Sequence, residues 1–293
     1  MKLNKIIKEL EQQGPEVYEK VSTRRDAVKS FSKKVAVAAL PLMVASMFKK
    51  TYGKTTDSVT DALNFFLEVE YLQYNMYHSA MATGNISTGT LIVAADRPGF
   101  QMIENEQLAH LNFWRNLIDA LGATPYTPSR FSGDAVTGNP YSPTSYDFTA
   151  GGKYDFYTSY ASFLEVAQSV EDVSVRAYLG QIPNLVANTN DVMTSAIKMS
   201  SVEARHASFI RLVRRFAGAI DNPKPWIANN MPPTIPLQSF YLGEDNTIQK
   251  GIDVSQFTGY NGVAITRAAA TEAFDEPMDK ATVLNNYAQF IIS

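Results

Sequence analysis

A small set of histidines and glutamates could give this chain its chemistry. The chain has no cysteine, so a metal ion would have to be bound by His, Asp or Glu, and neither a disulfide framework nor a cysteine nucleophile can exist. Glu203 and His206 stand three residues apart, and in a helix this separation leaves both side chains on one face. A carboxylate and an imidazole paired in this way suit a divalent transition metal ion.

Three other expected helices each place a polar side chain on their apolar stripe. Glu70, His110 and Glu171 lie on stripes whose members are separated by three or four residues. Burying several ionised carboxylates together costs many kcal/mol unless they are protonated or bind a cation. A pair of divalent metal ions would meet this need, because di-iron and di-manganese bundles take one Glu from each of two helices and Glu-x-x-His from each of the other two.

The second of these helices departs from that pattern. Gln107, not a glutamate, precedes His110 by three residues, while Glu106 precedes it by four and is rotated by about 100° from Gln107. Either Glu106 takes over the bridging role, or the site has lost a carboxylate and binds metal poorly. The predicted metal ligands are therefore Glu70, Glu106, His110, Glu171, Glu203 and His206.

Each of these residues also has a purely structural interpretation. A glutamate such as Glu70 on a helix stripe can extend its carboxylate to solvent, and the third histidine, His78, is better explained as a surface or tyrosine-packed residue. Polar residues occur on four separate stripes, and this coincidence supports the metal site more strongly than any single residue does.

Hydrophobic periodicity predicts helices over about 57–82, 98–122, 152–180 and 184–218. Asp57 and Ser58 are expected to cap the first, Gly122 to end the second, and Pro183 to separate the last two. A long connection over 123–150 separates the two helix pairs, as in a ferritin-like bundle. The predicted fold is thus an all-α, ferritin-like four-helix bundle with a long central crossover and an irregular C-terminal wrap that ends in a short helix near Met278 to Ile292.

The first 50 residues differ in charge from the rest of the chain. They hold eleven Lys and Arg against five Asp and Glu, a net charge of +6, which leaves -9 for the remainder because the whole chain carries -3. Arg24 and Arg25 precede an apolar run from Val35 to Phe48, which resembles a twin-arginine export signal, although an amphipathic helix packed on the domain is the alternative. We expect a leader over 1–53, a bundle over 54–220 and an extension over 221–293.

The stretches Leu63–Leu72, Val170-Glu171 and Val202–Ala207, together with His110 in its Ala-His-Leu-Asn-Phe setting, resemble the bacterial ferritin-like domain family that includes plant desiccation-related proteins. The similarity spans about residues 20–292, and members often carry a twin-arginine leader. The resemblance implies the fold and the candidate ligands far more than a reaction. We interpret the chain as a non-haem metal-binding protein of the periplasm or cell envelope, exported by the machinery that reads the leader.

A di-iron or di-manganese centre, with zinc not excluded, would serve oxidase, peroxide-scavenging or metal-handling chemistry. The alternative is a metal-poor structural or stress-protective protein that keeps the bundle. Assembly into homo-oligomers is compatible with both interpretations. Nucleic acid is not an expected partner, because a net charge of -3 gives no basic field.

Overall fold

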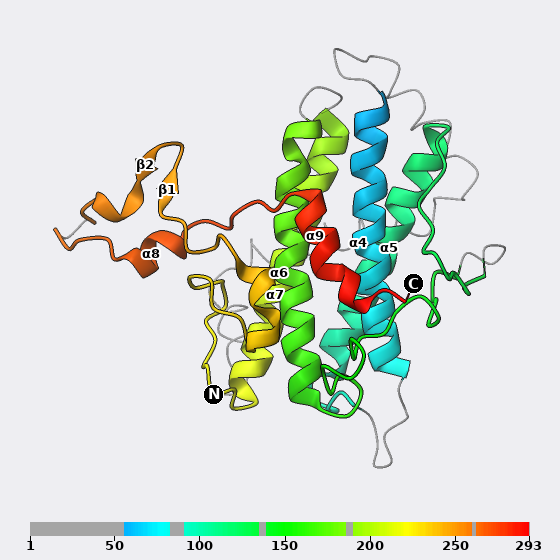
Figure 1. Cartoon of the computed structure of the whole chain (residues 1–293), viewed down its shortest axis with the longest axis horizontal. Helices are drawn as coiled ribbons and strands as arrows, with labels where there is room; N and C mark the ends of the chain where they lie inside the picture. Colours follow the sequence, from blue (N-terminus) through cyan, green and yellow to red (C-terminus); the bar gives the residue numbers. More distant parts are fainter. Residues whose placement is uncertain (1–55, 83–90, 135–138, 186–189, 260–261, 293) are drawn as a thin grey trace, which may run out of the picture. The chain divides into compact units, whose positions relative to one another are not determined.

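The computed structural model describes residues 56–82, 91–134, 139–185, 190–259 and 262–292. The leader predicted over 1–53 lies outside these residues. Four long helices dominate the described part: α4 (Thr56–Ala82), α5 (Arg97–Ala120), α6 (Tyr160–Leu185) and α7 (Asn190–Phe216). They run side by side, with α4 against α5 and α6, and α6 against α7, which confirms the predicted four-helix bundle (Figure 1).

The helix ends agree with the sequence in part. Gly122 adopts a left-handed conformation (φ 75°), donates its N–H to Asp119 and leaves Ala123 to donate to Ile118, the two bonds of a Schellman motif at the end of α5. The predicted cap of α4 is wrong, because the helix already begins at Thr56 and includes Asp57 and Ser58.

The limits predicted for the third helix are also wrong. Helix α6 begins at Tyr160, not near 152, because Gly151 and Gly152 have positive φ and belong to a series of turns. At its other end α6 continues through Pro183 to Leu185. A proline in the last turn removes one backbone hydrogen bond, and here the helix tolerates that loss.

Aromatic side chains fill the core beside the polar residues. The rings of Phe66 and Tyr178 stack with centroids 4.3 Å apart, and Trp114 packs on Phe66 at 5.2 Å. The indole N–H of Trp114 donates to the Tyr178 hydroxyl at 2.8 Å. These contacts join α4, α5 and α6, and they fix the helices that carry the polar stripes.

The C-terminal extension packs partly on α6. Its elements are η1 (Ile235–Tyr241), the antiparallel pair β1 (Ile248–Gln249) and β2 (Ile252–Asp253), η2 (Val254–Gln256), α8 (Arg267–Thr271), α9 (Lys280–Tyr287) and η3 (Ala288–Phe290). Elements η1 and α9 contact α6, whereas the hairpin and α8 lie away from the four long helices (Figure 1).

One arginine of α6 holds this extension. The guanidinium of Arg176 donates to the carbonyls of Phe240, Leu242 and Glu276 at 2.7 to 2.8 Å, and its Nε lies 2.7 Å from the buried carboxylate of Glu244. The extension is thus bound to the bundle by a buried charged side chain.

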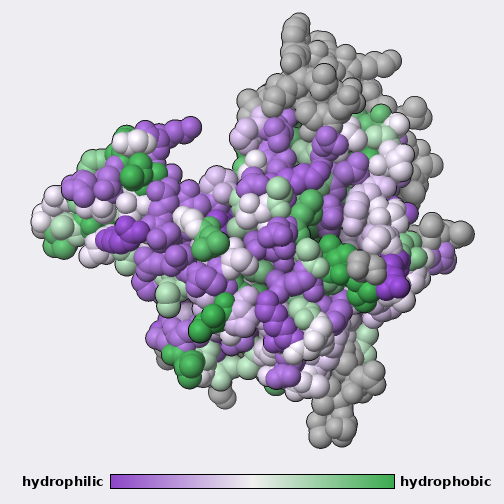
Figure 2. Space-filling model, in the orientation of Figure 1, coloured by the Kyte–Doolittle hydropathy of each residue, from purple (hydrophilic) through white to green (hydrophobic). Residues whose placement is uncertain are grey.

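The face of the molecule in Figure 2 is mainly hydrophilic, with separate apolar patches. Exposed apolar side chains of the extension include Ile248, Ile252 and Phe257. Among the helices of the described residues, none is long and apolar enough to cross a membrane.

Candidate metal centre

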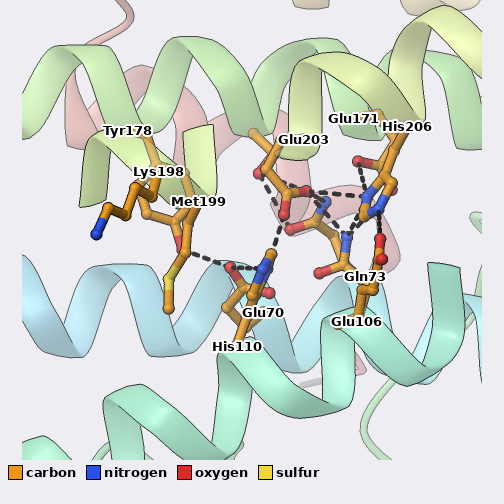
Figure 3. A network of polar contacts seen from close by, with 12 residues as sticks. Glu70, Gln73, Glu106, His110, Glu171, Tyr178, Lys198, Met199, Glu203 and His206 are labelled. Atoms are coloured by element: carbon orange, nitrogen blue, oxygen red, sulfur yellow. Dashed lines mark hydrogen bonds and ion pairs between the residues drawn. The ribbon is translucent and has the colours of Figure 1, made fainter. Parts of the chain in front are cut away.

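The structure brings five of the six predicted ligands together in the middle of the bundle. Glu70 comes from α4, His110 from α5, Glu171 from α6, and Glu203 with His206 from α7; their side chains point toward one another (Figure 3). The three glutamates are completely buried, and the two histidines are also buried. Their positions follow from the apolar stripes, which all face the bundle axis.

Two overlapping groups of three ligands can be distinguished. The first, here called the His110 group, contains Glu70, His110 and Glu203. Nδ1 of His110 lies 2.9 Å from Oε1 of Glu203 and 3.6 Å from Oε1 of Glu70. One ligand atom from each residue lies within 4.8 Å of the other two, close enough for one ion to contact all three.

The second group, here called the His206 group, contains Glu171, Glu203 and His206. Nδ1 of His206 lies 3.5 Å from Oε2 of Glu171 and 3.8 Å from Oε2 of Glu203. Glu203 belongs to both groups, so its two carboxylate oxygens face different halves of the cluster. This is the position of a bridging carboxylate.

Glu106 lies on the outer side of His206 and belongs to neither group. Its Oε2 is 2.7 Å from Nε2 of His206, and its side chain is 41% exposed. This contact places the proton of the neutral imidazole on Nε2 and leaves Nδ1 free to accept from the core. The sequence left open whether Glu106 or Gln107 faces the cluster. In the structure Gln107 is buried in the core, and Glu106 lies at its rim.

Two glutamines and two tyrosines complete the cluster. Nε2 of Gln107 donates to Glu203 at 2.9 Å, and Nε2 of Gln73 donates to the same Oε2 at 2.7 Å. The hydroxyl of Tyr77 donates to Glu171 at 2.5 Å, and that of Tyr178 donates to Glu70.

The residues predicted from the sequence did not include Gln73 or these two tyrosines. The available signal for Gln73 was its spacing, since it follows Glu70 by three residues and shares its face. The hydroxyl of Ser174 on α6 donates to Oε1 of Gln73 at 3.1 Å. His78, in contrast, lies outside the cluster, where its Nδ1 is 2.6 Å from Glu104 and its ring packs on Tyr141.

Burial and mutual charge shift the pKa values of the cluster. Desolvation raises the pKa of Glu70, and it raises that of Glu171 to about 8. Desolvation acts in the same direction on Glu203, but contacts with His110 and His206 outweigh it and hold the pKa of Glu203 well below its usual value.

The histidines shift in the opposite direction. Burial opposes their protonation, yet the neighbouring carboxylates raise the pKa of His110 to about 10 and that of His206 well above its usual value. Without a metal ion, protons held by the imidazoles and by the carboxyl groups with raised pKa therefore reduce the buried negative charge, and a bound cation would replace protons of this cluster.

The residues fit a divalent metal ion. Within the described residues, the buried atoms Glu70 Oε2, Glu171 Oε2, Glu203 Oε1 and His110 Nδ1 have no hydrogen-bond partner. A buried polar atom without a partner costs about 1–3 kcal/mol, so their convergence calls for a shared cation. Carboxylate oxygen with imidazole nitrogen is a donor set that iron, manganese and zinc accept.

Comparison with known proteins agrees with this geometry. The family model of the ferritin-like domain matches residues 58–215, which include α5 and α6 and nearly all of α4 and α7. More than half of the chain is matched, and the protein belongs to the ferritin-like domain family. No curated protein matches the chain.

Proposed function

We propose that this protein is a non-haem metal-binding protein that holds divalent iron or manganese in the core of its bundle, with zinc as the third candidate. The observation that carries the proposal is the convergence of buried carboxylate and imidazole atoms that have no partner within the described residues. Ligands drawn from different helices would fix the ion rigidly, as in carboxylate-bridged helical bundles.

The residues around the ligands prepare them for this role. The hydroxyls of Tyr77 and Tyr178 donate to one oxygen of Glu171 and Glu70 respectively, and they leave the other oxygen of each carboxylate without a partner. Outer hydrogen bonds of this kind fix the orientation of ligands. The cluster is therefore arranged before an ion enters.

Glu106 gives the buried cluster a connection to solvent. Its carboxylate is partly exposed and contacts Nε2 of His206, so it can accept a proton from the imidazole and release it to water. When bound, iron or manganese would supply redox chemistry toward dioxygen or peroxide. The protein side supplies charge balance, orientation and this proton path, which suits an oxidase, a peroxide scavenger or a metal carrier.

A metal-poor structural or stress-protective function is the second candidate, and one observation favours it. Gln73 and Gln107 already satisfy Oε2 of Glu203, so part of the cluster is stable through hydrogen bonds within the protein. A protein of this kind would keep the bundle and hold no metal ion.

We also propose that the protein is exported to the periplasm or cell envelope by a twin-arginine pathway. The proposal is supported by Arg24 and Arg25 ahead of the apolar run Val35 to Phe48. Changing both arginines to lysine should retain the protein in the cytoplasm on fractionation. Unchanged fractionation would contradict the proposal.

Metal content tests the principal function. Full-length protein purified from its native compartment should contain iron or manganese by mass spectrometry, and Glu70→Gln should remove it. Glu68→Gln is the matched control, because Glu68 lies two residues away on α4 and interacts with Tyr126 and Lys280 instead of the cluster. Wild-type protein that stays free of metal after reconstitution would support the structural alternative.

A further inference from the structure

The two groups of ligands differ in how their polar atoms are satisfied. In the His110 group, each of the three residues has one buried atom with no hydrogen-bond partner among the described residues: Glu70 Oε2, His110 Nδ1 and Glu203 Oε1. Nδ1 of His110 is only 2.9 Å from Oε1 of Glu203, yet the pair lacks hydrogen-bond geometry. These atoms are arranged for a common cation.

In the His206 group, Glu171 Oε2 likewise has no partner among the described residues, but a side-chain amide of the protein contacts every member of this group. Nε2 of Gln107 lies 2.9 Å from Oε2 of Glu203, 3.3 Å from Oε1 of Glu171 and 3.3 Å from Nδ1 of His206. One amide nitrogen thus contacts all three members of the group. Gln73 adds a second hydrogen bond to the same oxygen of Glu203, at 2.7 Å.

The position of this nitrogen conflicts with a second ion. Metal–ligand bonds to nitrogen and oxygen are about 2.0–2.2 Å long, so an ion bound by Glu171, Glu203 and His206 would lie close to Nε2 of Gln107. The amide and the ion exclude each other. Since the N–H groups of the amide donate to both carboxylates, the amide also supplies part of the stabilisation that a cation would give.

The charge of the cluster also favours one divalent ion over two. The completely buried carboxylates of Glu70, Glu171 and Glu203 carry at most -3, and the fourth nearby carboxylate, Glu106, lies at the rim with its side chain 41% exposed, so two divalent ions would leave an excess positive charge among the buried side chains. One divalent ion leaves at most -1. The additional side chains that contact these carboxylates are donors, among them Gln73, Gln107 and Tyr77, and donors stabilise residual negative charge.

We propose that the cluster binds one divalent metal ion, in the His110 group, and that the side-chain amide of Gln107 takes the place of a second ion in the His206 group. This inference rests on the metal-binding function proposed above and adds the number of ions and the half of the cluster that holds them. The sequence led us to expect a centre with two ions. The proposed centre holds one ion, and the neutral amide of Gln107 occupies the place of the second.

The test is the number of Co(II) ions bound per full-length chain, measured by titration of the visible absorption and by mass spectrometry of the metal. The wild type should bind one ion, and Gln107→Glu, which supplies the missing carboxylate, should bind two. The matched pair His110→Ala and His206→Ala separates the halves. His110→Ala should weaken Co(II) binding by more than about 100-fold, which exceeds the loss of about 10–100-fold that is typical when a residue hydrogen-bonded to a ligand is removed. His206→Ala should still bind one ion.

Other outcomes would overturn the inference in distinguishable ways. Two ions in the wild type, or equal losses in the two histidine variants, would contradict the one-ion centre while the metal-binding function stands. One ion in Gln107→Glu would show that the amide does not displace the second. No Co(II) or Mn(II) bound to the wild type would overturn both proposals. Far-UV circular dichroism checks that each variant is folded, and if a histidine variant fails, the wild type and Gln107→Glu still decide.

Discussion

Metal binding should tighten as the pH rises, because the ion has to displace a proton from His110. Burial opposes the charge on this imidazole, but Glu70 and Glu203 raise the pKa of His110 to about 10 in the metal-free protein. Below that pH each ion that binds at His110 releases this proton, so the dissociation constant should fall about 10-fold per pH unit. Between about pH 6 and about pH 8 the expected change is roughly 100-fold.

The dissociation constant for Co(II) can be measured by competition with a chelator across this range. Calorimetry in two buffers of different ionisation enthalpy counts the protons released, and the expected number is close to one per ion. His78→Ala is the control, because His78 contacts Glu104 outside the cluster and its loss should leave the pH dependence unchanged. Affinity that does not depend on pH, with no proton released, would refute the reasoning.

Loss of the same His110 proton should lower the stability of the metal-free protein as the pH rises, whereas it tightens metal binding. The folded-state pKa of His110 is raised from 6.5 to about 10, so its contribution is complete below about pH 6.5 and is lost as the pH rises toward 10. The melting temperature in the presence of EDTA should therefore fall over this range. In the metal-loaded protein the ion has replaced this proton, so its loss should not lower the melting temperature over this range.

Three further changes have defined outcomes. Arg176→Met should destabilise the protein by about 3–5 kcal/mol in urea unfolding, because it leaves the buried carboxylate of Glu244 unpaired; a loss below about 1 kcal/mol would contradict this. Gly180→Ala should cost about 1–3 kcal/mol, since a Cβ there would lie 2.0 Å from the Met278 carbonyl; an unchanged melting temperature would show that the chain moves aside freely. Glu106→Ala should leave the one ion of the His110 group bound with little change in affinity, because Glu106 contacts His206 and no ligand of that group, and a lost ion would make Glu106 a direct ligand.

The sequence predicted the features that depend on local periodicity. The stripes that carry Glu70 and Glu203 repeat every three or four residues, and in a helix this alone determines which side chains face the core. The all-α bundle and its long central connection followed from the same pattern. The Schellman motif at Gly122 was also predictable, because glycine readily adopts the left-handed conformation.

The features that depend on how the helices pack against one another were not predictable. Spacing alone could not decide between Glu106 and Gln107, since positions four and three residues before His110 both lie near the same face. Only the packing of α5 against its neighbours places Gln107 among the carboxylates and Glu106 at the rim. The partnership of Gln73 with Glu203 likewise joins residues 130 positions apart.

Anomalous diffraction from crystals of the full-length protein grown with Mn(II) tests the central claim most directly. We expect one strong anomalous peak per chain inside the bundle, from an ion bonded to Glu70, His110 and Glu203. A bundle core without a peak, or manganese bound only at the surface, would contradict it.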